Sequence, residues 1–590
     1  MGSMNNTQNG HSHQDTPGAS TVAYFSMEIG LSPEMPTYGG GLGILAGDTL
    51  KAAADLGIPM VGVTLLHRKG YLSQHLDAWG NQTETEDIWY PEEHLEALPQ
   101  RVSLPIQGRP VMVRAWLYQI EGAQGHTVPV YFLDTELYEN HAEDRRITDY
   151  LYGGDGRYRL RQEAVLGLGG IAMLRALGYQ DVQTYHMNEG HSAFLALALL
   201  QEWCCHRGLF TFDHEGVTAV RSQCVFTTHT PVAAGHDEFP MELVRDVLGD
   251  FRSSMLRNTG GYRDGHLSMS HLALTFSDYV NGVSQRHGEV SQQLYPNHPI
   301  DSITNGVHAA TWVSPSFAQL YDKYTPDWRR DNAVLSQAAS IPLSEIQQAH
   351  REAKLQLLEE IQRRTDVALD PNAMTIGFAR RAAAYKRADL LFSDLERVKS
   401  IAREVGPFQV IYGGKAHAND GHSKDVIRRV FQAANAVKDT VRVIYLENYD
   451  MALAKLLCTG VDLWLNNPQK PLEASGTSGM KAALNGIPSL SVLDGWWVEG
   501  HQEGVTGWSI GNSDTALQDP IVEARVLYSK LEHVVLPMFY QRPNEYAEIM
   551  RSAIALNGSY FNTHRMIREY AQRAYRLDIG KMAPAPACAS

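Results

Sequence analysis

Cysteine is scarce in this chain, with five among 590 residues. The five are Cys204, Cys205, Cys224, Cys458 and Cys588. None forms a CxxC pair and their number is odd, so the pattern argues against a disulfide framework and against a zinc site of paired cysteines. We expect reduced, mostly buried thiols in a cytoplasmic protein without a metal site.

Long hydrophobic runs and an excess of basic residues are also missing. No segment approaches the roughly 20 apolar residues of a membrane span, and no secretory signal is visible. Lys and Arg number 51 against 66 Asp and Glu, which gives a net charge of -15. Nucleic-acid binding needs a basic footprint, so we expect neither a nucleic-acid nor a membrane partner. Local arginines can still hold a small anionic substrate.

Apolar strands alternate with helical segments in two sets along the chain. Cores stop growing at about 250–300 residues, so a chain of this length is expected to form two large domains. The expected strands are Val22–Ser26, Val61–Leu66, Val128–Leu133, Gln183–Met187 and Cys224–Thr228, then Met374–Ala379, Phe408–Gly413, Val441–Leu446, Leu463–Asn466 and Leu490–Leu493. The alternation predicts an α/β fold of two Rossmann-like, doubly wound domains that face a deep cleft.

The domain boundaries follow from this alternation. A helical stretch over about 331–365 separates the two sets, and we place the domains at 21–325 and 326–560. Residues 1–20 are expected to be a disordered tail that begins with vector-derived residues. Residues 561–590 are expected to hold a helix that returns to the first domain, followed by a mobile end.

The segment from Glu473 to Gly486 is the most informative motif. It follows the expected strand Leu463–Asn466 and is rich in Gly, Ser, Thr and Ala before it opens into a helix. Small residues let the backbone approach a ligand closely, and free N–H groups at a helix start favour an anion. The Lys481 amine is placed to form a Schiff base with an aldehyde cofactor. A tight turn with an ordinary surface lysine is the alternative.

The segment from Arg380 to Arg387 carries four cations directly after the expected strand Met374–Ala379. Such cations repel one another unless a counter-anion is present, and one or two phosphates would satisfy them. The alternative is a solvated basic helix face, which is what most charge runs are.

A glycine-rich turn, Tyr38–Gly43, follows the first expected strand. Gly41 and Gly43 fit G-x-G, but the next glycine is Gly47, one place too late for the dinucleotide fingerprint, so NAD binding is not supported. Close approach of the backbone to a sugar or a phosphate stays open, beside a plain tight turn.

Two histidine motifs end strands, namely His186–His191 and Thr228–Pro231. Their spacings match no zinc template, whereas a hydrogen bond from an imidazole to a sugar hydroxyl or a carboxylate needs only one residue. Structural histidines in polar loops are the alternative. The Asn305-Gly306 turn is weakly informative by itself.

Together these motifs resemble the glycogen and maltodextrin (α-glucan) phosphorylase family. Glu473–Lys481 is similar to its pyridoxal-phosphate signature, and 471–495 is similar to the short bacterial and archaeal branch. Further segments match in the family's order: Tyr24–Glu28, Tyr38–Gly43, Leu151–Asp155, His186–His191, Thr228–Pro231, Asn305-Gly306 and Tyr385–Arg387. The resemblance runs from about residue 22 to beyond 510 and implies a GT-B-type architecture.

The resemblance implies a pyridoxal 5'-phosphate cofactor, bound in the second domain as an aldimine on Lys481. Gly476, Thr477 and Ser478 would bind the cofactor's phosphate, and Arg380 and Lys386 would neutralise it. Tyr24, Trp312 and Tyr449 would line the cofactor pocket. The residues that the resemblance makes catalytic are Lys481, Arg381, Lys386 and His229.

By the resemblance, the first domain (21–325) is the one on the glucan and phosphate side of the cleft. Arg381 would hold the substrate phosphate, with the Gly40–Leu42 loop beside it. The implied substrate-binding residues are Gly40, Gly41, Leu42, Asp155, His229, Asn305, Tyr385, Glu473, Ser475 and Gly476. Glu473 would accept hydrogen bonds from sugar hydroxyls.

The implied reaction is reversible, retaining phosphorolysis of α-1,4-glucan chains by inorganic phosphate, which releases glucose 1-phosphate. The cofactor's phosphate would be the acid–base group, with a pKa near neutrality. The partners would be α-glucan, phosphate and a second copy of the chain in a homodimer. Gly156 stands where long phosphorylases have an asparagine, and Ala383 and Ala384 replace a histidine–glutamate pair, so local polar contacts differ.

Two alternatives belong to other classes. A nucleotide-sugar-dependent α-glucan synthase-type glucosyltransferase would share the architecture and the glycine loop, but it has no need for Lys481 in this turn. A non-catalytic glucan-binding protein would be favoured by loss of Lys481, Arg381 or Lys386, and all three are present.

Overall fold

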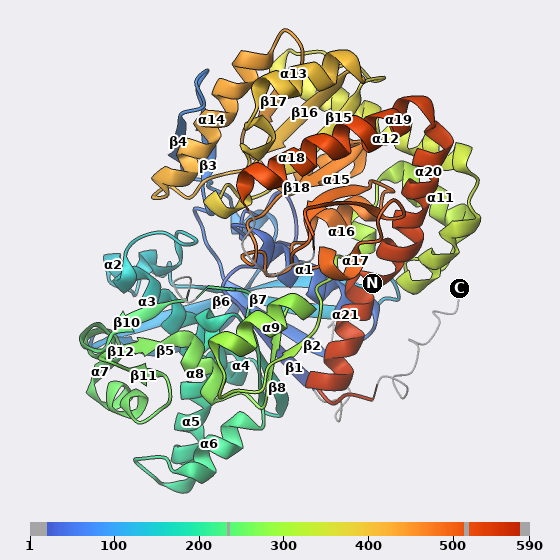
Figure 1. Ribbon diagram of the computed structural model, residues 1–590. Coiled ribbons are helices and arrows are strands. Elements are labelled where there is room, and N and C mark those ends of the chain that lie inside the picture. Colours follow the sequence, from blue (N-terminus) through green and yellow to red (C-terminus); the bar gives the residue numbers. More distant parts are fainter. Residues whose placement is uncertain (1–20, 233–235, 513–518, 579–590) are drawn as a thin grey trace, which may run out of the picture.

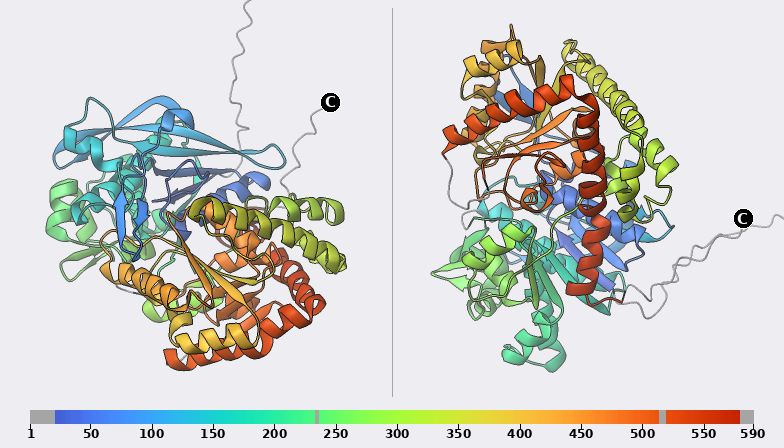
Figure 2. Two further views of the ribbon diagram at one scale, coloured as in Figure 1. Left: turned by 90° about the horizontal axis from the view of Figure 1, so that it is seen from above. Right: turned by 45° about the vertical axis from the view of Figure 1, so that its right-hand side comes forward.

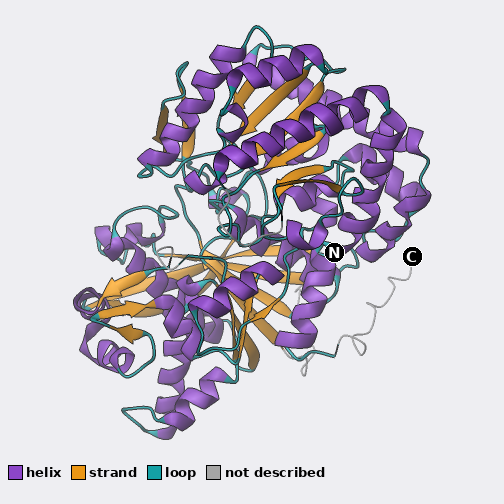
Figure 3. Cartoon of the chain, viewed as in Figure 1, coloured by secondary structure: helices purple, strands orange, loops and turns teal. Residues whose placement is uncertain are grey.

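The computed structural model describes residues 21–232, 236–512 and 519–578. The predicted tails at 1–20 and at the extreme C-terminus, together with Cys588, lie outside the described residues. Most strands belong to a nine-stranded and a six-stranded sheet. Helices flank both sheets, which occupy the lower and the upper part of the molecule in Figures 1 and 3.

The first sheet has the order β14-β13-β9-β8-β1-β2-β7-β6-β5. Its parallel strands are β1 (Thr21–Ser26), β2 (Met60–Leu65), β7 (Thr127–Asp134), β8 (Val182–Asn188), β9 (Cys224–Thr227), β13 (Tyr279–Gly282) and β14 (Asp301–Ser302). From β7 to β13 they follow the doubly wound order 3-2-1-4-5-6. An antiparallel pair, β5 (Glu96–Ile106) and β6 (Arg109–Glu121), extends the β7 edge.

The second sheet has the order β17-β16-β15-β18-β19-β20 and is parallel throughout. Its strands are β15 (Met374–Ala379), β16 (Phe408–Gly413), β17 (Arg442–Leu446), β18 (Leu463–Asn466), β19 (Ser489–Val492) and β20 (Gly507–Ile510). This is again the order 3-2-1-4-5-6. The prediction of two parallel α/β sheets is confirmed. Ligands of such sheets bind outside the carboxyl ends of the strands where the order reverses, here β1/β8 and β15/β18.

Helices cover the sheets because apolar residues recur on one face of each. In α12 (Leu343–Thr365) the buried residues include Ile346, Ala349, Ala353 and Leu357, a helical spacing. The helices nearest the motifs are α1 (Gly41–Asp55), α3 (Gly156–Ala164), α4 (Gly170–Ala176), α5 (Phe194–Arg207), α15 (Met451–Gly460) and α16 (Ser478–Ala483). A π-turn, η3 (Val165–Gly169), joins α3 to α4.

The remaining α-helices complete the layers. They are α2 (Ala142–Arg145), α6 (His214–Arg221), α7 (Met241–Arg257), α8 (Met269–Thr275), α9 (Gln285–Leu294), α10 (Ala309–Trp312), α11 (Pro315–Tyr324), α13 (Leu395–Glu404), α14 (Gly421–Val437), α17 (Trp497–Gly500), α18 (Pro520–Lys530), α19 (Leu536–Gln541), α20 (Pro543–Ser552) and α21 (Thr563–Glu569). A small sheet of β10 (Glu238–Pro240), β11 (Tyr262–Arg263) and β12 (His266–Ser268) lies beside α7.

The strands at the centre of each sheet are buried along their whole length. Every residue of β2, β15 and β16 is buried, as expected for parallel strands with helices on both faces. In β5, by contrast, exposed and half-buried residues alternate before the end of the strand, because this strand lies at the sheet edge.

A hairpin connects the two parts of the molecule. Its strands, β3 (Ser73–Leu76) and β4 (Gln82–Thr85), follow β2 in the chain but lie beside α14 of the second part (Figure 1). Gln74 and Asn448 exchange two hydrogen bonds of 3.1 and 3.0 Å between the backbone N–H of each and the side-chain oxygen of the other. Lys424 of α14 forms an ion pair of 2.6 Å with Glu84.

The last helical segment packs on the first sheet. From α20 the chain runs down the molecule into α21 and η11 (Tyr570–Ala574), which is seen most clearly in the right-hand view of Figure 2. His186 of β8 lies 2.6 Å from the Tyr575 hydroxyl, and Tyr570 lies 3.1 Å from Thr227 of β9.

Among the described residues, no helix is both long and apolar enough to span a membrane. Four cysteines lie in the described ranges and all have free thiols; Cys205 is exposed, whereas Cys204, Cys224 and Cys458 are buried.

Candidate active site

Two cations and one carboxylate meet at the β15/β18 junction. Arg380 directly follows β15, and Glu473 lies in the loop after β18. The Lys386 Nζ atom lies 2.7 and 2.6 Å from the two Glu473 carboxylate oxygens, and Arg380 Nη2 lies 2.6 Å from Oε2. Burial alone raises the pKa of Glu473, but the charges of Arg380 and Lys386 outweigh it and hold that pKa at about 2. The predicted cation cluster therefore has an internal counter-anion.

Arg381 stands apart from this ion-pair network. Its side chain reaches solvent and forms no hydrogen bond with the rest of the described chain. Tyr71, Tyr152, Tyr385 and Glu28 act on its charge electrostatically. A guanidinium offers five N–H donors, so Arg381 is available to bind an anion.

The glycine turn of the first part lies against Arg381. A Cβ atom on Gly40 would come within 4.0 Å of the Arg381 Cδ atom, and one on Gly41 would meet nothing within 4 Å. The backbone N–H groups of Gly39 and Gly40 donate to Glu28 Oε2 at 2.5 and 3.1 Å. Loops after β1 and β15 therefore meet at one place.

Glu28 is a site residue that sequence reasoning did not single out. It follows β1 and is almost fully buried, and its second carboxylate oxygen accepts a hydrogen bond of 2.8 Å from Tyr152. A Cβ atom on Gly43 would lie 2.7 Å from this carboxylate, so Gly43 gives Glu28 its room. The available signal was its position, directly after a buried strand at the end of the sheet where ligands bind.

Lys481 projects from α16 onto an aromatic face. Its Nζ atom lies 3.6 Å from the centre of the Trp312 ring, and Trp312 donates a 2.7 Å hydrogen bond to Asp48 Oδ2. Burial lowers the pKa of Lys481, and this outweighs the opposing effects of Asp48 and Cys458. The other Asp48 oxygen is buried and accepts no hydrogen bond from the described residues. A lysine with a lowered pKa supplies the neutral amine that attacks a carbonyl.

The turn before α16 depends on glycine. Gly476 has φ 73°, a left-handed conformation that side chains with a Cβ rarely adopt. Ser475 is buried, and its carbonyl accepts a 2.9 Å hydrogen bond from Trp496 N–H. The Thr477 hydroxyl has no hydrogen-bond partner within the described ranges, whereas the Ser478 hydroxyl accepts a 3.1 Å bond from buried Trp464. Thr477 is therefore freer to bind a ligand than Ser478.

His229 follows β9 and is held on two sides. Its Nε2 atom lies 2.6 Å from Asn188 Oδ1, and its backbone N–H donates to Glu189 Oε2 at 2.8 Å. Burial lowers the pKa of His229 to about 4. Glu189 has φ 73° although it is not glycine, and such strain is commonly found at functional sites.

The other predicted residues lie as follows. Asn305 is buried, and its Oδ1 atom has no partner among the described residues. Lys386 Nζ lies 4.4 Å from the Tyr385 ring centre. Tyr449 packs near Gly413, where an added Cβ would come within 3.0 Å of its ring. Leu42 lies in the first turn of α1.

For two predicted residues, Asp155 and Tyr24, the contacts in the structure are ones that support the fold. Asp155 caps α3, because its Oδ1 atom accepts a 2.9 Å hydrogen bond from Tyr158 N–H. Tyr24 packs edge-on against His186, with ring centres 4.8 Å apart, and its hydroxyl is near Thr49. Neither ring contacts nor hydrogen bonds of the described residues join Tyr24 to Lys481.

A cluster of metal-ligand types lies away from these loops. Asp55 Oδ2 is 2.8 Å from His308 Nε2 and 3.0 Å from His564 Nε2, and all three residues are buried. Burial raises the pKa of Asp55, but the hydrogen bonds from both imidazoles outweigh it and lower the pKa. We interpret this cluster as a structural one, whose hydrogen bonds connect α1, α10 and α21.

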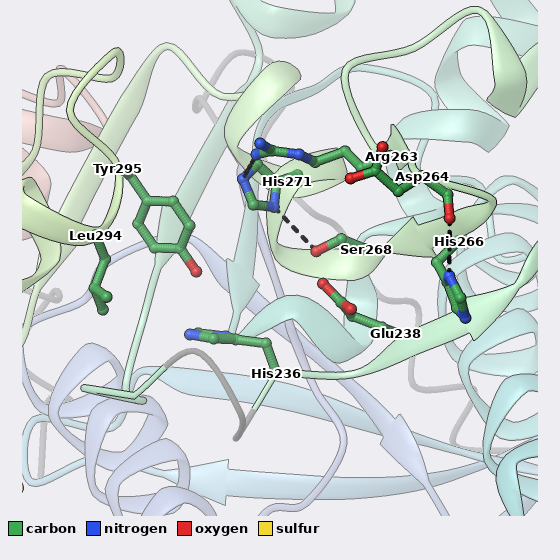
Figure 4. A pocket seen from close by; sticks show the side chains of 9 residues that line it. All are labelled: His236, Glu238, Arg263, Asp264, His266, Ser268, His271, Leu294 and Tyr295. Carbon is green, nitrogen blue, oxygen red and sulfur yellow. Dashed lines mark hydrogen bonds between the residues drawn. The ribbon is translucent and has the colours of Figure 1, made fainter.

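A cavity of about 300 Å³ lies beyond the His229 loop (Figure 4). Its lining residues are His236, Glu238, Arg263, Asp264, His266, Ser268, His271, Leu294 and Tyr295. In Figure 4 Tyr295 lies beside His236, and the two rings are edge-on with centres 6.0 Å apart. The His236 Nε2 atom is buried without a partner among the described residues. Sequence reasoning missed this cavity because its walls come from short strands and from α9.

Comparison with known proteins decides the family. A profile described as "Carbohydrate phosphorylase" matches residues 250–507. Maltodextrin phosphorylase of Thermococcus litoralis is 39% identical, over 94% of this chain and 70% of that protein. Glycogen phosphorylase of Aquifex aeolicus is 33% identical, over 96% of this chain and 88% of that protein. This chain belongs to the carbohydrate phosphorylase family. The resemblance predicted from Glu473–Lys481 is thereby confirmed.

Other relatives extend this result. Glycogen phosphorylase of Mycobacterium tuberculosis is 38% identical, over 94% of this chain and 70% of that protein. The matches span both sheets of the chain, not only the profile region in its middle. In this phosphorylase the predicted residues thus lie at three places. Arg380, Lys386 and Glu473 meet at β15/β18, Lys481 lies on α16, and His229 lies at β8/β9.

Proposed function

We propose that this chain is an α-glucan phosphorylase, which catalyses reversible phosphorolysis of α-1,4-glucan chains and releases glucose 1-phosphate. The observation that carries the proposal is Arg381, an unpaired guanidinium that lies against the Gly40 loop and next to the Arg380–Lys386–Glu473 network. Family membership supports the same reaction.

Arg381 binds the substrate phosphate in this proposal. Its five donors suit a tetrahedral anion, and the Gly40 and Gly41 backbone leaves open space beside it. The Gly39 and Gly40 N–H groups are held by Glu28, so the loop is positioned before the substrate arrives. Retention of the sugar's configuration requires the phosphate to attack the face that the leaving glucan vacates.

The residues around Lys481 fit pyridoxal 5'-phosphate. The buried amine has a lowered pKa and the Trp312 ring lies beside it. Asp48, whose charge acts on Lys481, has a buried carboxylate oxygen without a partner among the described residues. When bound, the cofactor supplies a phosphate that serves as an acid–base group. Lys481 would hold the cofactor covalently, and Thr477 and Ser478 would bind its phosphate.

Arg380, Lys386 and Glu473 would act as one unit. A phosphate that arrives near Arg380 and Lys386 competes with Glu473 for the same N–H donors. The displaced carboxylate is then available to sugar hydroxyls, together with Ser475 and Tyr385. In the absence of a phosphate, Glu473 keeps buried Lys386 and half-buried Arg380 paired.

The finer architecture is part of the proposal. Residues 21–325 and 326–560 would be two Rossmann-like domains that face a GT-B-type cleft, with 561–590 returning to the first. The approach of Gly40 to Arg381 and the contacts of α21 with α1 support this arrangement. A homodimer is supported by the family resemblance alone, and the free thiols support a reducing compartment such as the cytoplasm.

The test is an assay of the purified chain with inorganic phosphate and maltodextrin, with glucose 1-phosphate as the readout. We expect glucose 1-phosphate to form, and we expect borohydride to fix a cofactor on the peptide that contains Lys481. Activity with a nucleotide sugar alone would support the synthase-type glucosyltransferase instead. Glucan binding without any turnover would support a binding protein.

A further inference from the structure

Three neighbouring strands of the first sheet end in hydrogen-bonding side chains. In the register of the sheet, Ser26 of β1 pairs with Asn188 of β8, and Asn188 pairs with Thr227 of β9. His229 follows Thr227 by two residues. The side chains of Ser26, Asn188 and His229 therefore lie in a row across the carboxyl end of the sheet.

The protons along this row are determined by its first acceptor. The Ser26 hydroxyl donates to the Glu28 carbonyl at 2.7 Å, and a carbonyl can only accept. Ser26 Oγ must then accept the 3.0 Å hydrogen bond from Asn188 Nδ2. This orients the amide, so that Asn188 Oδ1 faces His229 Nε2 at 2.6 Å. An amide oxygen cannot donate, so His229 Nε2 must carry a proton.

We propose that Asn188 is a positioning residue that holds His229 as the Nε2–H tautomer, so that Nδ1 presents a lone pair to a hydroxyl of the glucosyl unit. The inference rests on the proposed function, because a glucosyl unit must bind beside His229. Among the described residues no hydrogen bond reaches Nδ1. The hydroxyl that Nδ1 contacts would therefore donate its proton.

The surroundings of His229 favour the neutral ring. Burial is the main reason why its pKa falls to about 4; the charge of Glu189 opposes this fall and that of His191 adds to it. His186 and His287 also act on His229 electrostatically. A neutral imidazole has one donor and one acceptor, and Asn188 decides which nitrogen has which role.

Neutrality at this position suits the proposed reaction. Phosphorolysis passes through a state in which the sugar ring gains positive charge, as in glycoside hydrolysis. A cationic imidazolium beside the ring would oppose that charge, whereas a neutral acceptor nitrogen does not. An amide partner accepts from Nε2–H without stabilising the imidazolium as a carboxylate would.

The decisive variant is Asn188→Asp, which keeps the size and replaces the amide by a carboxylate. The Ser26 hydroxyl can rotate to donate to the new carboxylate, so the row stays hydrogen-bonded. A carboxylate within hydrogen-bond distance raises a histidine pKa by about 1–3 units. We expect kcat/KM of the variant to show a new ionisation, with activity lost about tenfold per unit as the pH falls below it.

The wild type is expected to lack an ionisation of His229 between pH 5.5 and 8, so that only the ionisations of the phosphates shape its profile there. The matched control is Asn332→Asp, which also buries a carboxylate, since Asn332 is buried and donates to the Trp328 carbonyl far from these loops. The control is expected to keep the wild-type pH profile. A profile of Asn188→Asp that superimposes on the wild type would overturn the proposal.

A second measurement does not depend on turnover. Long-range ¹H–¹⁵N correlation of histidine-labelled protein, with His229→Gln for assignment, reports which ring nitrogen carries the proton. The Nε2–H tautomer of His229 in the wild type is expected, and the Nδ1–H tautomer would refute the proposal even where Asn188→Asp fails to fold. A wild type that lacks phosphorolysis but shows Nε2–H would overturn the proposed function and leave the tautomer assignment intact.

Discussion

The amine of Lys481 lies 3.6 Å from the centre of the Trp312 ring, and this places the lysine between an aromatic face and the α1 helix. Trp312 is fixed in turn by its hydrogen bond to Asp48. A lysine that points at an aromatic face loses water, and burial lowers its pKa. The pair therefore prepares a nucleophilic amine in a fixed position.

Replacement of Lys481 by Ala is expected to abolish covalent cofactor attachment. Because the amine positions the reacting phosphates, we expect activity to fall at least about a hundredfold. Mass spectrometry after borohydride reduction measures the attachment, and circular dichroism checks the fold. The control is Lys455→Ala, which replaces a half-buried lysine of α15. This variant is expected to keep the borohydride-reduced cofactor adduct on Lys481. A reduced adduct in Lys481→Ala would refute the assignment.

Replacement of Glu473 by Gln is expected to leave buried Lys386 and half-buried Arg380 without an anion. Breaking a buried ion pair costs about 3–5 kcal/mol, which denaturant unfolding measures. Inorganic phosphate should restore more stability to the variant than to the wild type, up to about 2.7 kcal/mol at a hundredfold excess over Kd. Glu345→Gln removes an exposed pair with Lys323 and should cost about 0–1 kcal/mol. Equal phosphate responses of variant and wild type would contradict the proposed anion site.

Replacement of Gly476 by Ala tests the turn before α16. The left-handed φ makes a Cβ strained, at a cost of about 1 kcal/mol or more. The new methyl would lie 3.4 Å from a Glu473 oxygen, an ordinary contact, so we expect the strained turn itself to shift and activity to be lost. Gly125→Ala carries the same φ penalty, with nothing within 4 Å, and should lose stability but not activity. Parallel kinetics and thermal melts compare the two, and full activity of Gly476→Ala would argue against the site.

Asp494 is expected to make stability depend on pH. Its Oδ2 atom accepts a 2.9 Å bond from Glu473 N–H, and burial raises its pKa to about 6, with a further contribution from the Glu473 charge. The folded state thus binds a proton more tightly than the unfolded state, and stability falls as the pH rises from about 4 to about 6. Asp494→Asn should remove this fall and gain about 2–3 kcal/mol above pH 6.

Chemical denaturation between pH 4 and 8 measures this effect. Asp439→Asn, an exposed substitution after α14, is the control and should leave the slope unchanged. An unchanged pH dependence in Asp494→Asn would show that Asp494 does not cause the fall in stability between pH 4 and 6.

Much of the second sheet could be predicted because its strands are short apolar runs. The predicted ranges of β15, β16 and β18 agree with the structure residue for residue. The pair β5 and β6 was missed, because exposed residues alternate with half-buried ones along most of β5 and recur along β6, so neither strand is an unbroken apolar run. The hairpin β3–β4 was missed for a similar reason, since it is polar and packs on a distant part of the chain.

The sequence predicted which loops form the site, but it did not predict which side chains in those loops contact one another. Position after buried strands pointed to the segments that hold Arg380, Arg381 and Lys481, whereas the individual roles of these residues came from the family resemblance. The ion pair of Lys386 with Glu473 joins residues 87 positions apart, and no spacing rule reports such a distance. Glu28 was missed because a single carboxylate after a strand is common, and its role depends on two glycine N–H groups that only the folded loop brings to it.

The docking of the chain's last helical segment on β8 has a consequence for biosynthesis. The hydrogen-bond partner of His186 is the Tyr575 hydroxyl, 389 residues further along the chain. One partner of Asp55 is His564, which is 509 residues away. While the ribosome is still adding the second sheet, the first sheet has buried polar groups whose partners do not yet exist. The N-terminal half is therefore expected to reach its full stability only after His564 and Tyr575 have been synthesised, and a chain truncated before them is expected to bind chaperones.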